Sequence, residues 1–207
     1  NVSCAGEEDG IIKLSVQGGN GLGGDPFTWS LGVASPSDST ATDLSPGRYF
    51  MTVTDQNGCS DTTSYVIGEP IPIQAIIPTP TEPLCFGDQT TISVTSASGG
   101  NGAPYQFSVN NTSLSPLDRV VPVFGGQEVT ISVFDFRGRG CSFDTTLFIS
   151  QPPPVEVALP DEIEVQLGDS VRLSPDVFST QPIDSIIWSP TTYLSQNNIL
   201  NPTIRPI

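Results

Sequence analysis

The chain has 207 residues, of which 20 are glycine, 20 are proline and none is histidine. Acidic residues outnumber basic ones by 22 to 7, and the formal net charge of −15 disfavours binding to nucleic acid or to anionic membrane surfaces. The lack of histidine removes the commonest general base and zinc ligand, which disfavours most catalytic chemistries except those of carboxylates. No run of about 18 apolar residues occurs, so the sequence predicts no membrane insertion.

Short runs of alternating apolar and polar residues predict β-strands from the start of the chain. One run covers residues 12–16 and leads to a glycine pair, and another covers residues 49–53. The sequence Asp-Gln-Asn-Gly at 55–58 predicts a hairpin turn in which Gly58 takes a positive φ. Period-two runs separated by Gly, Pro, Asn and Asp are typical of an antiparallel β-sandwich.

The same features recur in the same order about 82 residues later. The matched segments are 4–6 with 85–87, 12–16 with 92–94, 18–19 with 99–100, 27–30 with 105–108, 49–53 with 129–133, 58–63 with 140–146, and 67–70 with 149–152. An ordered series of this kind indicates an internal duplication.

Two proline-rich joints, at residues 69–72 and 151–154, divide the chain. We therefore predict a first repeat at residues 1–70, a second repeat at residues 71–153 and a different third segment at residues 154–207. A strand is predicted after each joint, at Ile73–Ile77 and Val155–Leu159, and the third segment has further strand candidates at Ile163–Leu167, Val171–Leu173 and Ile183–Trp188. By this logic the first repeat lacks its opening strand and the third segment lacks its C-terminal strands, so we expect a window on a longer polypeptide or strands supplied by a neighbour.

The four cysteines permit three pairings. Cys4 and Cys59 lie 55 positions apart, and Cys85 and Cys141 lie 56 apart. The pairing Cys4–Cys59 with Cys85–Cys141 is the one that gives each repeat its own bridge, and we predict it. Closing such a loop stabilises a small β-domain by about 4 kcal/mol in the chain-entropy model. Disulfides form in oxidising compartments, so we expect the protein to be exported.

The series Cys-x-Gly, alternating strand, Gly-Gly, aromatic-x-Trp-Ser, Gly-x-Tyr, Val-x-Asp and Gly-Cys resembles the SprB repeat. This repeat occurs in very large cell-surface adhesins of gliding Bacteroidota. The first repeat carries the whole series from Cys4 to Pro70, whereas the second lacks the tryptophan and has Val129 where the tyrosine stands. The third segment, from Leu167-Gly168-Asp169 through Trp188-Ser189-Pro190 to Asn201-Pro202, is similar to PKD-like modules.

The resemblance implies an all-β chain of tandem Ig-like or PKD-like antiparallel β-sandwich modules in an elongated rod. It also implies export by the type 9 secretion system and display at the cell surface, as in gliding motility. It names no ligand and transfers no functional residue.

Three groups of residues are candidates for a site. Asp55, Asn57 and Asp61 could supply oxygen ligands to calcium, although Asp and Asn at a turn also serve the backbone. The two tryptophans, Trp29 and Trp188, could stack on a sugar or fill a core. The acidic run 7–9 could suggest a carboxylate pair, but adjacent acids after Cys4 fit a solvated turn better. We predict no catalytic residue and no cofactor other than this candidate calcium.

The function that these observations favour is a non-enzymatic, extracellular stalk or attachment segment in cell adhesion. Its partners would be neighbouring modules or other copies of the protein, and surface glycans are a further candidate. One alternative is a repeating subunit of an extracellular filament that is assembled by strand sharing. Another is a carbohydrate-binding accessory region of a secreted hydrolase.

Overall fold

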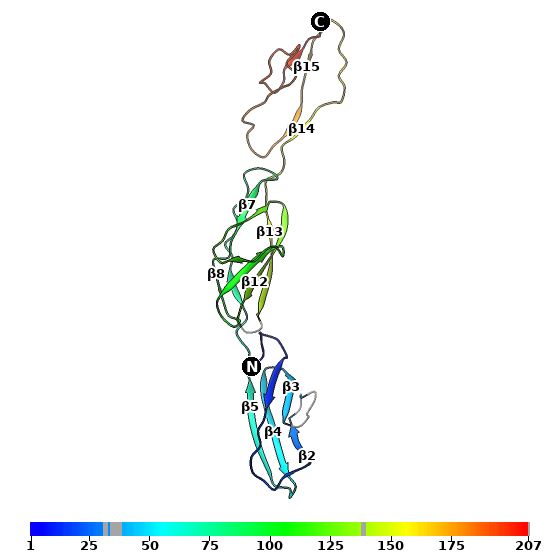
Figure 1. The fold of residues 1–207 in the computed structure, drawn as a ribbon. Helices are drawn as coiled ribbons and strands as arrows, with labels where there is room; N and C mark the ends of the chain where they lie inside the picture. The colour runs from blue at the N-terminus through cyan, green and yellow to red at the C-terminus, as the bar shows by residue number, and fades with distance from the viewer. Residues whose placement is uncertain (31–32, 34–38, 138–139, 207) are drawn as a thin grey trace. The chain divides into compact units, whose positions relative to one another are not determined.

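The computed structural model describes residues 1–30, 33, 39–137 and 140–206 of the chain. This part is all-β, built from several antiparallel sheets (Figure 1). The described residues include no helix that is long and apolar enough to cross a membrane. The chain forms two compact units, of which one comprises residues 1–80, 91–122 and 128–148 and the other comprises residues 81–90, 123–127 and 149–207.

Two sheets make up the first repeat. Strand β1 (Gly10–Lys13) pairs with β3 (Thr40–Leu44), and the order β2-β4-β5 joins Leu22–Trp29, Gly47–Asp55 and Ser60–Ile67. One buried cluster draws side chains from both sheets: Val2, Ile12, Ala41, Leu44, Tyr49 and Ile67. A shared apolar core of this kind is consistent with β-sandwich packing.

The second repeat holds the largest sheet, in the order β10-β9-β12-β13. Its strands are Ser115–Pro116, Tyr105–Val109, Gln127–Asp135 and Ser142–Ile149. Two smaller pairs join β6 (Gln74–Ile76) to β8 (Ser96–Ser98) and β7 (Gln89–Ile92) to β11 (Val121–Phe124). The buried apolar residues are Ile73, Ile92, Val94, Phe107, Val109, Val123, Val129, Ile131, Val133, Cys141 and Ile149.

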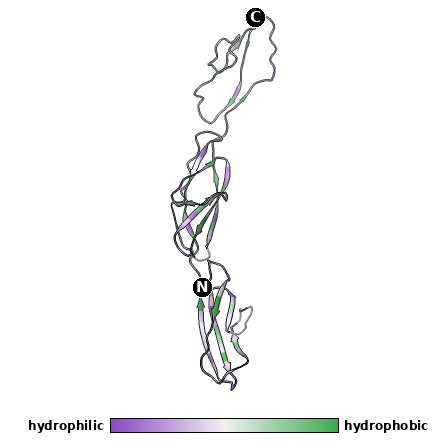
Figure 2. Ribbon diagram, viewed as in Figure 1, coloured by the Kyte–Doolittle hydropathy of each residue, from purple (hydrophilic) through white to green (hydrophobic). Residues whose placement is uncertain are grey.

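Alternation in the sequence sets which side chains these sheets bury, because successive residues of a strand face opposite sides. Strand β1 alternates buried and exposed residues, and β7 does the same in the opposite phase. Figure 2 shows hydrophobic and hydrophilic residues interspersed along the strands. The predicted run 12–16 is only partly a strand, because β1 ends at Lys13.

The third segment forms two short pairs, β14 (Glu156–Ala158) with β16 (Asp176–Phe178) and β15 (Val171–Arg172) with β17 (Thr203–Ile204). The predicted strands at 163–167 and 183–188 are wrong, since neither segment pairs with another strand. An apolar run forms a strand when a neighbour takes up its backbone hydrogen bonds in series. The amide of Trp188 makes one such bond, to the carbonyl of Asn197, but neither run forms a ladder with other described residues. Within residues 150–206, all of them described, Pro202 is the one buried residue.

The structure also corrects the alignment of the two repeats by two residues. Phe27 on β2 lies opposite Val53, and Phe107 on β9 lies opposite Val133. Phe27 and Phe107 are therefore equivalent, whereas the matched motifs had placed Trp29 with Phe107. The pairing of β2 with β4 is irregular between Leu22 and Phe27, while β9 pairs regularly with β12.

Candidate functional site

The cysteines pair between the repeats and not within them. Cys4 forms a disulfide with Cys141, 137 positions away, and the Cα atoms lie 5.5 Å apart. Cys59 and Cys85 carry free, exposed thiols. The predicted bridges Cys4–Cys59 and Cys85–Cys141 are therefore wrong.

Strand β5 explains why each repeat cannot close its own bridge. Cys59 immediately precedes the strand, which spans Ser60–Ile67. Cys4 belongs to a loop at the other end, where the amide of Val2 donates to the carbonyl of Gly68 over 3.0 Å. A strand of this length spans roughly 25 Å, whereas the Cα atoms of a disulfide lie about 4–7 Å apart. The sequence spacing matched the cysteines of one repeat, but the strand between them holds them apart.

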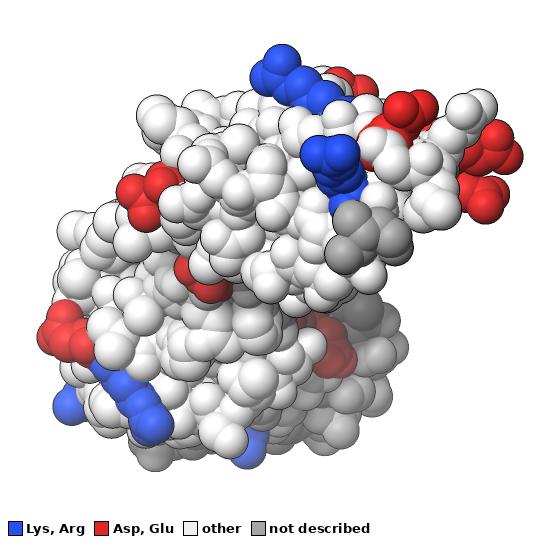
Figure 3. Space-filling model, turned by 90° about the horizontal axis from the view of Figure 1, so that it is seen from above, with Lys and Arg blue, Asp and Glu red and all other residues white. Residues whose placement is uncertain are grey.

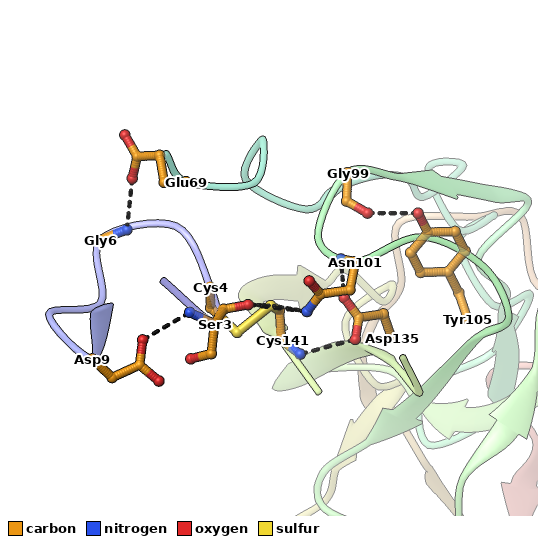
Figure 4. Close-up of a disulfide and its surroundings, with 10 residues drawn as sticks. All are labelled: Ser3, Cys4, Gly6, Asp9, Glu69, Gly99, Asn101, Tyr105, Asp135 and Cys141. Carbon is orange, nitrogen blue, oxygen red and sulfur yellow. Dashed lines mark hydrogen bonds between the residues drawn. A yellow bond between two sulfur atoms is a disulfide. The ribbon is translucent and has the colours of Figure 1, made fainter. Parts of the chain in front are cut away.

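The Cys4 loop is a tight, hydrogen-bonded turn. Gly6 takes a φ of +80°, and the amide of Glu7 donates to the carbonyl of Cys4 over 3.2 Å. The amide of Gly6 donates to Glu69 Oε2 over 3.0 Å, and the amide of Ser3 donates to Asp9 Oδ1 over 2.7 Å (Figure 4). These bonds fix the direction in which Cys4 presents its sulfur.

The same turn recurs around Cys85. Gly87 takes a φ of +81°, and the amide of Asp88 donates to the carbonyl of Cys85 over 3.2 Å. The amide of Gly87 donates to Gln151 Oε1 over 3.1 Å, in the role that Glu69 plays for Gly6. The chain therefore builds this cysteine loop twice, once as a disulfide and once with a free thiol.

A buried aspartate holds the other half of the disulfide. Asp135, 2% exposed, accepts hydrogen bonds at Oδ1 from the amide of Cys141 over 3.0 Å and at Oδ2 from the amide of Asn101 over 2.6 Å. Asn101 in turn donates through Nδ2 to the carbonyl of Ser3 over 3.0 Å and to Cys141 Sγ over 3.2 Å (Figure 4). The side chains of Asp135 and Asn101 thus form a cradle that holds both Cys141 and the incoming Cys4 loop.

An equivalent cradle surrounds Cys59. Asp55 accepts at Oδ1 from the amides of Asn57 and Cys59, each over 2.9 Å. At Oδ2 it accepts from the amide of Asn20 over 3.2 Å and from Asn20 Nδ2 over 3.3 Å. The predicted hairpin turn is confirmed, with Gly58 at a φ of +84° between β4 and β5.

These amides also set the charge state of Asp55. The hydrogen bond from the amide of Cys59, foremost, holds the pKa of the Asp55 carboxyl below its ordinary value; partial burial opposes it, and the bonds from Asn20 and Asn57 add to it. The carboxylate is therefore ionised wherever the hairpin is folded at neutral pH.

The asparagines of the two cradles are the residues that sequence reasoning missed. Asn20 and Asn101 each follow a glycine pair, in the sequence Gly-Gly-Asn-Gly at 18–21 and at 99–102. The glycine pairs were matched between the repeats, and extending that match by one residue would have identified both asparagines.

The calcium candidates are occupied by other contacts. Both oxygens of Asp55 accept backbone hydrogen bonds, as is common for Asp at a turn. Asp61 lies on β5 opposite Val53, and its Oδ1 accepts from the amide of Thr62 over 2.9 Å. In the part of the chain that the structure describes, no three His, Cys, Asp or Glu side chains are grouped to hold a metal ion.

The aromatic and acidic candidates have structural contacts as well. Trp29 is partly buried and packs against the cluster between the two sheets of the first repeat. Trp188 is partly buried and donates from Nε1 to the carbonyl of Ile199 over 2.8 Å. In the acidic run, Glu8 accepts from Ser45 Oγ over 3.0 Å and Asp9 from the amide of Ser3. These contacts favour the structural interpretation of each residue.

An open recess of about 570 Å³ adjoins the Cys59 hairpin in the first repeat. Its lining residues include the exposed stretch 15–19 and the cradle residues Asp55 and Cys59. In the second repeat the matching stretch carries β8, which pairs with β6, and the amide of Gly100 donates to the carbonyl of Ile71 over 2.7 Å. The recess of the first repeat therefore lies at the place where the second repeat holds β6, the strand that follows the joint at 69–72.

On the face shown in Figure 3, acidic side chains are spread over an otherwise uncharged surface with basic side chains among them. The intramolecular disulfide is compatible with an extracellular protein.

Comparison with known proteins does not assign the chain to a family. No family model matches the chain, and no curated protein matches it.

Proposed function

We propose that the chain is a non-enzymatic structural segment of an exported bacterial surface protein, acting as a stalk or attachment module in adhesion. The observation that supports this most directly is the covalent tie between Cys4 and Cys141, which joins one repeat to the next. A segment that transmits force between a cell and a surface benefits from such a tie, because it limits how far the chain lengthens when a repeat unfolds.

The mechanical effect of this disulfide follows from the length of the chain segment that it encloses. The disulfide closes a loop over a sequence separation of 137 residues. An extended chain spans roughly 3.4 Å per residue, so the closed loop hides about 470 Å of contour length from a force applied at the ends. In a stalk, this limits how far one molecule lengthens under load.

Single-molecule extension tests this mechanical role. A chain pulled from its two ends should be about 470 Å shorter at full extension when oxidised than after reduction. The control is a chain with Cys59→Ser and Cys85→Ser, which should behave as the unaltered chain does, because these thiols are free and exposed. Equal extension before and after reduction would remove the support that the disulfide gives to a load-bearing role.

Electron microscopy tests the location and the form of the protein. Antibodies raised against the chain should label the outside of intact cells of the source organism, along thread-like surface structures. Label confined to the cell interior would contradict the proposal. Regular symmetric filaments would favour the subunit of an extracellular appendage over a tethered adhesin.

The appendage alternative has one specific observation in its favour. Residues 15–17 of the first repeat are exposed and have no strand partner among the described residues, whereas the matching residues of the second repeat lie in β8. An unpaired stretch of this kind can accept a strand from a neighbour, which is how subunits share strands in some filaments.

A further inference from the structure

The first repeat holds a second copy of the site that binds the Cys4 loop. Asp55, Asn20 and Cys59 correspond to Asp135, Asn101 and Cys141. In both copies the aspartate accepts from the cysteine amide through Oδ1 and from the asparagine amide through Oδ2. The backbone pairing matches too, because the amide of each aspartate donates to the carbonyl of its cysteine over 2.9 or 3.0 Å. One copy is occupied and the other is open.

Occupation changes the partner of one asparagine atom. In the occupied copy, Asn101 Nδ2 donates to the carbonyl of Ser3, the residue before the incoming cysteine. In the open copy, Asn20 Nδ2 donates back to Asp55 Oδ2 over the longer distance of 3.3 Å. The donor that recognises the loop is therefore present in the first repeat and is available to a carbonyl that arrives beside Cys59.

The recess next to Cys59 points to the same occupant. The chain that follows the joint at 69–72 enters the second repeat. It supplies Ile73, which is buried, and strand β6, which pairs with β8. In the first repeat the equivalent place is the recess of about 570 Å³ that reaches from Leu14 to Cys59. A neighbouring repeat that places its cysteine loop beside Cys59 would also place the strand that follows its joint in this recess.

We propose that the Cys59 end of the first repeat binds another repeat of the same kind. The Cys-x-Gly cysteine of that repeat forms a disulfide with Cys59, and the strand of its joint fills the recess. Cys85, which sits exposed in a preformed Cys-x-Gly loop, is the matching half toward a further repeat. This inference deepens the proposed structural role and rests on it, because it makes the inter-repeat disulfide a recurring joint.

The bond forms by thiol–disulfide exchange with an external disulfide such as oxidised glutathione. Cys59 first attacks glutathione disulfide, which gives a mixed disulfide and one reduced glutathione. The thiolate of the incoming cysteine then attacks the Cys59 sulfur and expels the second glutathione. Two protein thiols are oxidised, one glutathione disulfide is reduced to two thiols, and one protein disulfide results.

The main test lengthens the chain by one repeat. Residues 1–81 are placed ahead of Asn1, so that the added copy supplies a Cys4 loop and a joint strand 81 positions before the existing ones. The chain is refolded in a glutathione buffer, the free thiols are alkylated, and the disulfides are mapped by mass spectrometry. We expect the added copy's Cys4 to pair with the original Cys59, while the original Cys4 pairs with Cys141.

The original Cys4–Cys141 bond serves as the internal control for folding. If that bond forms while the original Cys59 stays free, or pairs with the cysteine of its own repeat, the proposal is wrong. Asn20→Ala in the original copy should lower the yield of the Cys59 bond by about two- to tenfold, the effect of one hydrogen bond. The same change should leave the Cys4–Cys141 bond intact.

A second measurement uses the chain as it stands, should the longer one not fold. A peptide of residues 1–9 competes with glutathione for mixed disulfides at Cys59 and at Cys85. Cys59 should favour the peptide over glutathione by about two- to tenfold, because Asn20 recognises the Ser3 carbonyl, and Cys85 should show no preference. Equal partition at both cysteines, or a preference that Asn20→Ala leaves unchanged, would overturn the proposal. Both readouts report on Cys59 and are independent of the cell-surface labelling, so either proposal can fail without the other.

Discussion

The two repeats share their motifs but differ in what covers them. In the second repeat, residues 96–98 pair with β6 and Asp135 is buried under the Cys4 loop. In the first repeat, residues 15–17 are exposed and pair with no strand in the part of the chain that the structure describes, and Cys59 is exposed. The same aspartate–asparagine–cysteine arrangement is therefore an interior joint in one repeat and an open surface in the other. In the second repeat, the chain that covers this arrangement comes from the Cys4 loop of the first repeat and from β6.

The largest expected effect comes from breaking the covalent joint. Replacing both Cys4 and Cys141 with serine should lower the free energy of unfolding by up to about 5 kcal/mol, because the unfolded chain regains the entropy of a very long loop. Urea denaturation measures this change. The matched double variant, Cys59→Ser with Cys85→Ser, should shift stability by less than about 0.5 kcal/mol, since both thiols are exposed. Equal losses in the two variants would contradict the pairing.

The next largest effect should be the difference in unfolding free energy between matching core substitutions in the two repeats. Phe107 is fully buried, so Phe107→Ala should destabilise the protein by about 3–5 kcal/mol. Its structural equivalent Phe27 is only partly buried, and Phe27→Ala should cost about 1–2 kcal/mol. Denaturation curves of the two variants compare these losses directly. The reverse order would contradict the difference in burial between Phe107 and Phe27.

Loss of the cradle aspartate should likewise lower the unfolding free energy more in the second repeat than in the first. Asp135→Ala leaves the amides of Asn101 and Cys141 without an acceptor in a buried place, which should cost about 3 kcal/mol in unfolding free energy. Asp55→Ala should cost clearly less, because water replaces the lost acceptor at the exposed hairpin. Hydrogen exchange at the two cysteine amides gives a local measure. Stronger protection at Cys59 than at Cys141 in the unaltered protein would argue against this difference.

The smallest effect is the pH dependence of the open cradle. The pKa of Asp55 is lowered in the folded protein, chiefly by the amide of Cys59, so the ionised form stabilises the hairpin. That contribution is fully present above the ordinary Asp pKa of about 3.9 and is lost as pH falls through the lower folded value. Carbon-detected NMR of the Asp55 carboxyl should show a midpoint below the ordinary one. Asp55→Asn should remove this pH dependence of amide exchange at Cys59.

Much of the fold followed from local patterns. The predicted runs 49–53 and 129–133 lie in strands β4 and β12, and the turn at 55–58 formed a hairpin with Gly58 at positive φ. These features are local, because a strand's faces and a turn's backbone depend on neighbouring residues. The predicted strands at 163–167 and 183–188 failed because a strand also needs a partner, which local alternation cannot supply.

The candidate site was predictable in its parts but not in its connections. Four matched cysteines, two glycine pairs and two hairpin aspartates were visible in the duplicated sequence. The asparagines after the glycine pairs were visible as well, but nothing local indicates that Asn101 reaches the carbonyl of Ser3. That contact joins residues of two different repeats, so its existence depends on how the repeats meet.

The sequence by itself determined the recurrence of the motifs, the strands that contain residues 49–53 and 129–133, and the hairpin at 55–58. Tertiary structure alone decided the disulfide, because the similar spacings of 55 and 56 residues say nothing about which ends of a strand the cysteines occupy. Strand β5 keeps Cys59 and Cys4 at its opposite ends, and the joint between repeats brings Cys4 within 5.5 Å of Cys141 by Cα distance. Which cysteines bond depends on the distance between them in the folded chain, and the length of an extended strand keeps Cys4 and Cys59 too far apart.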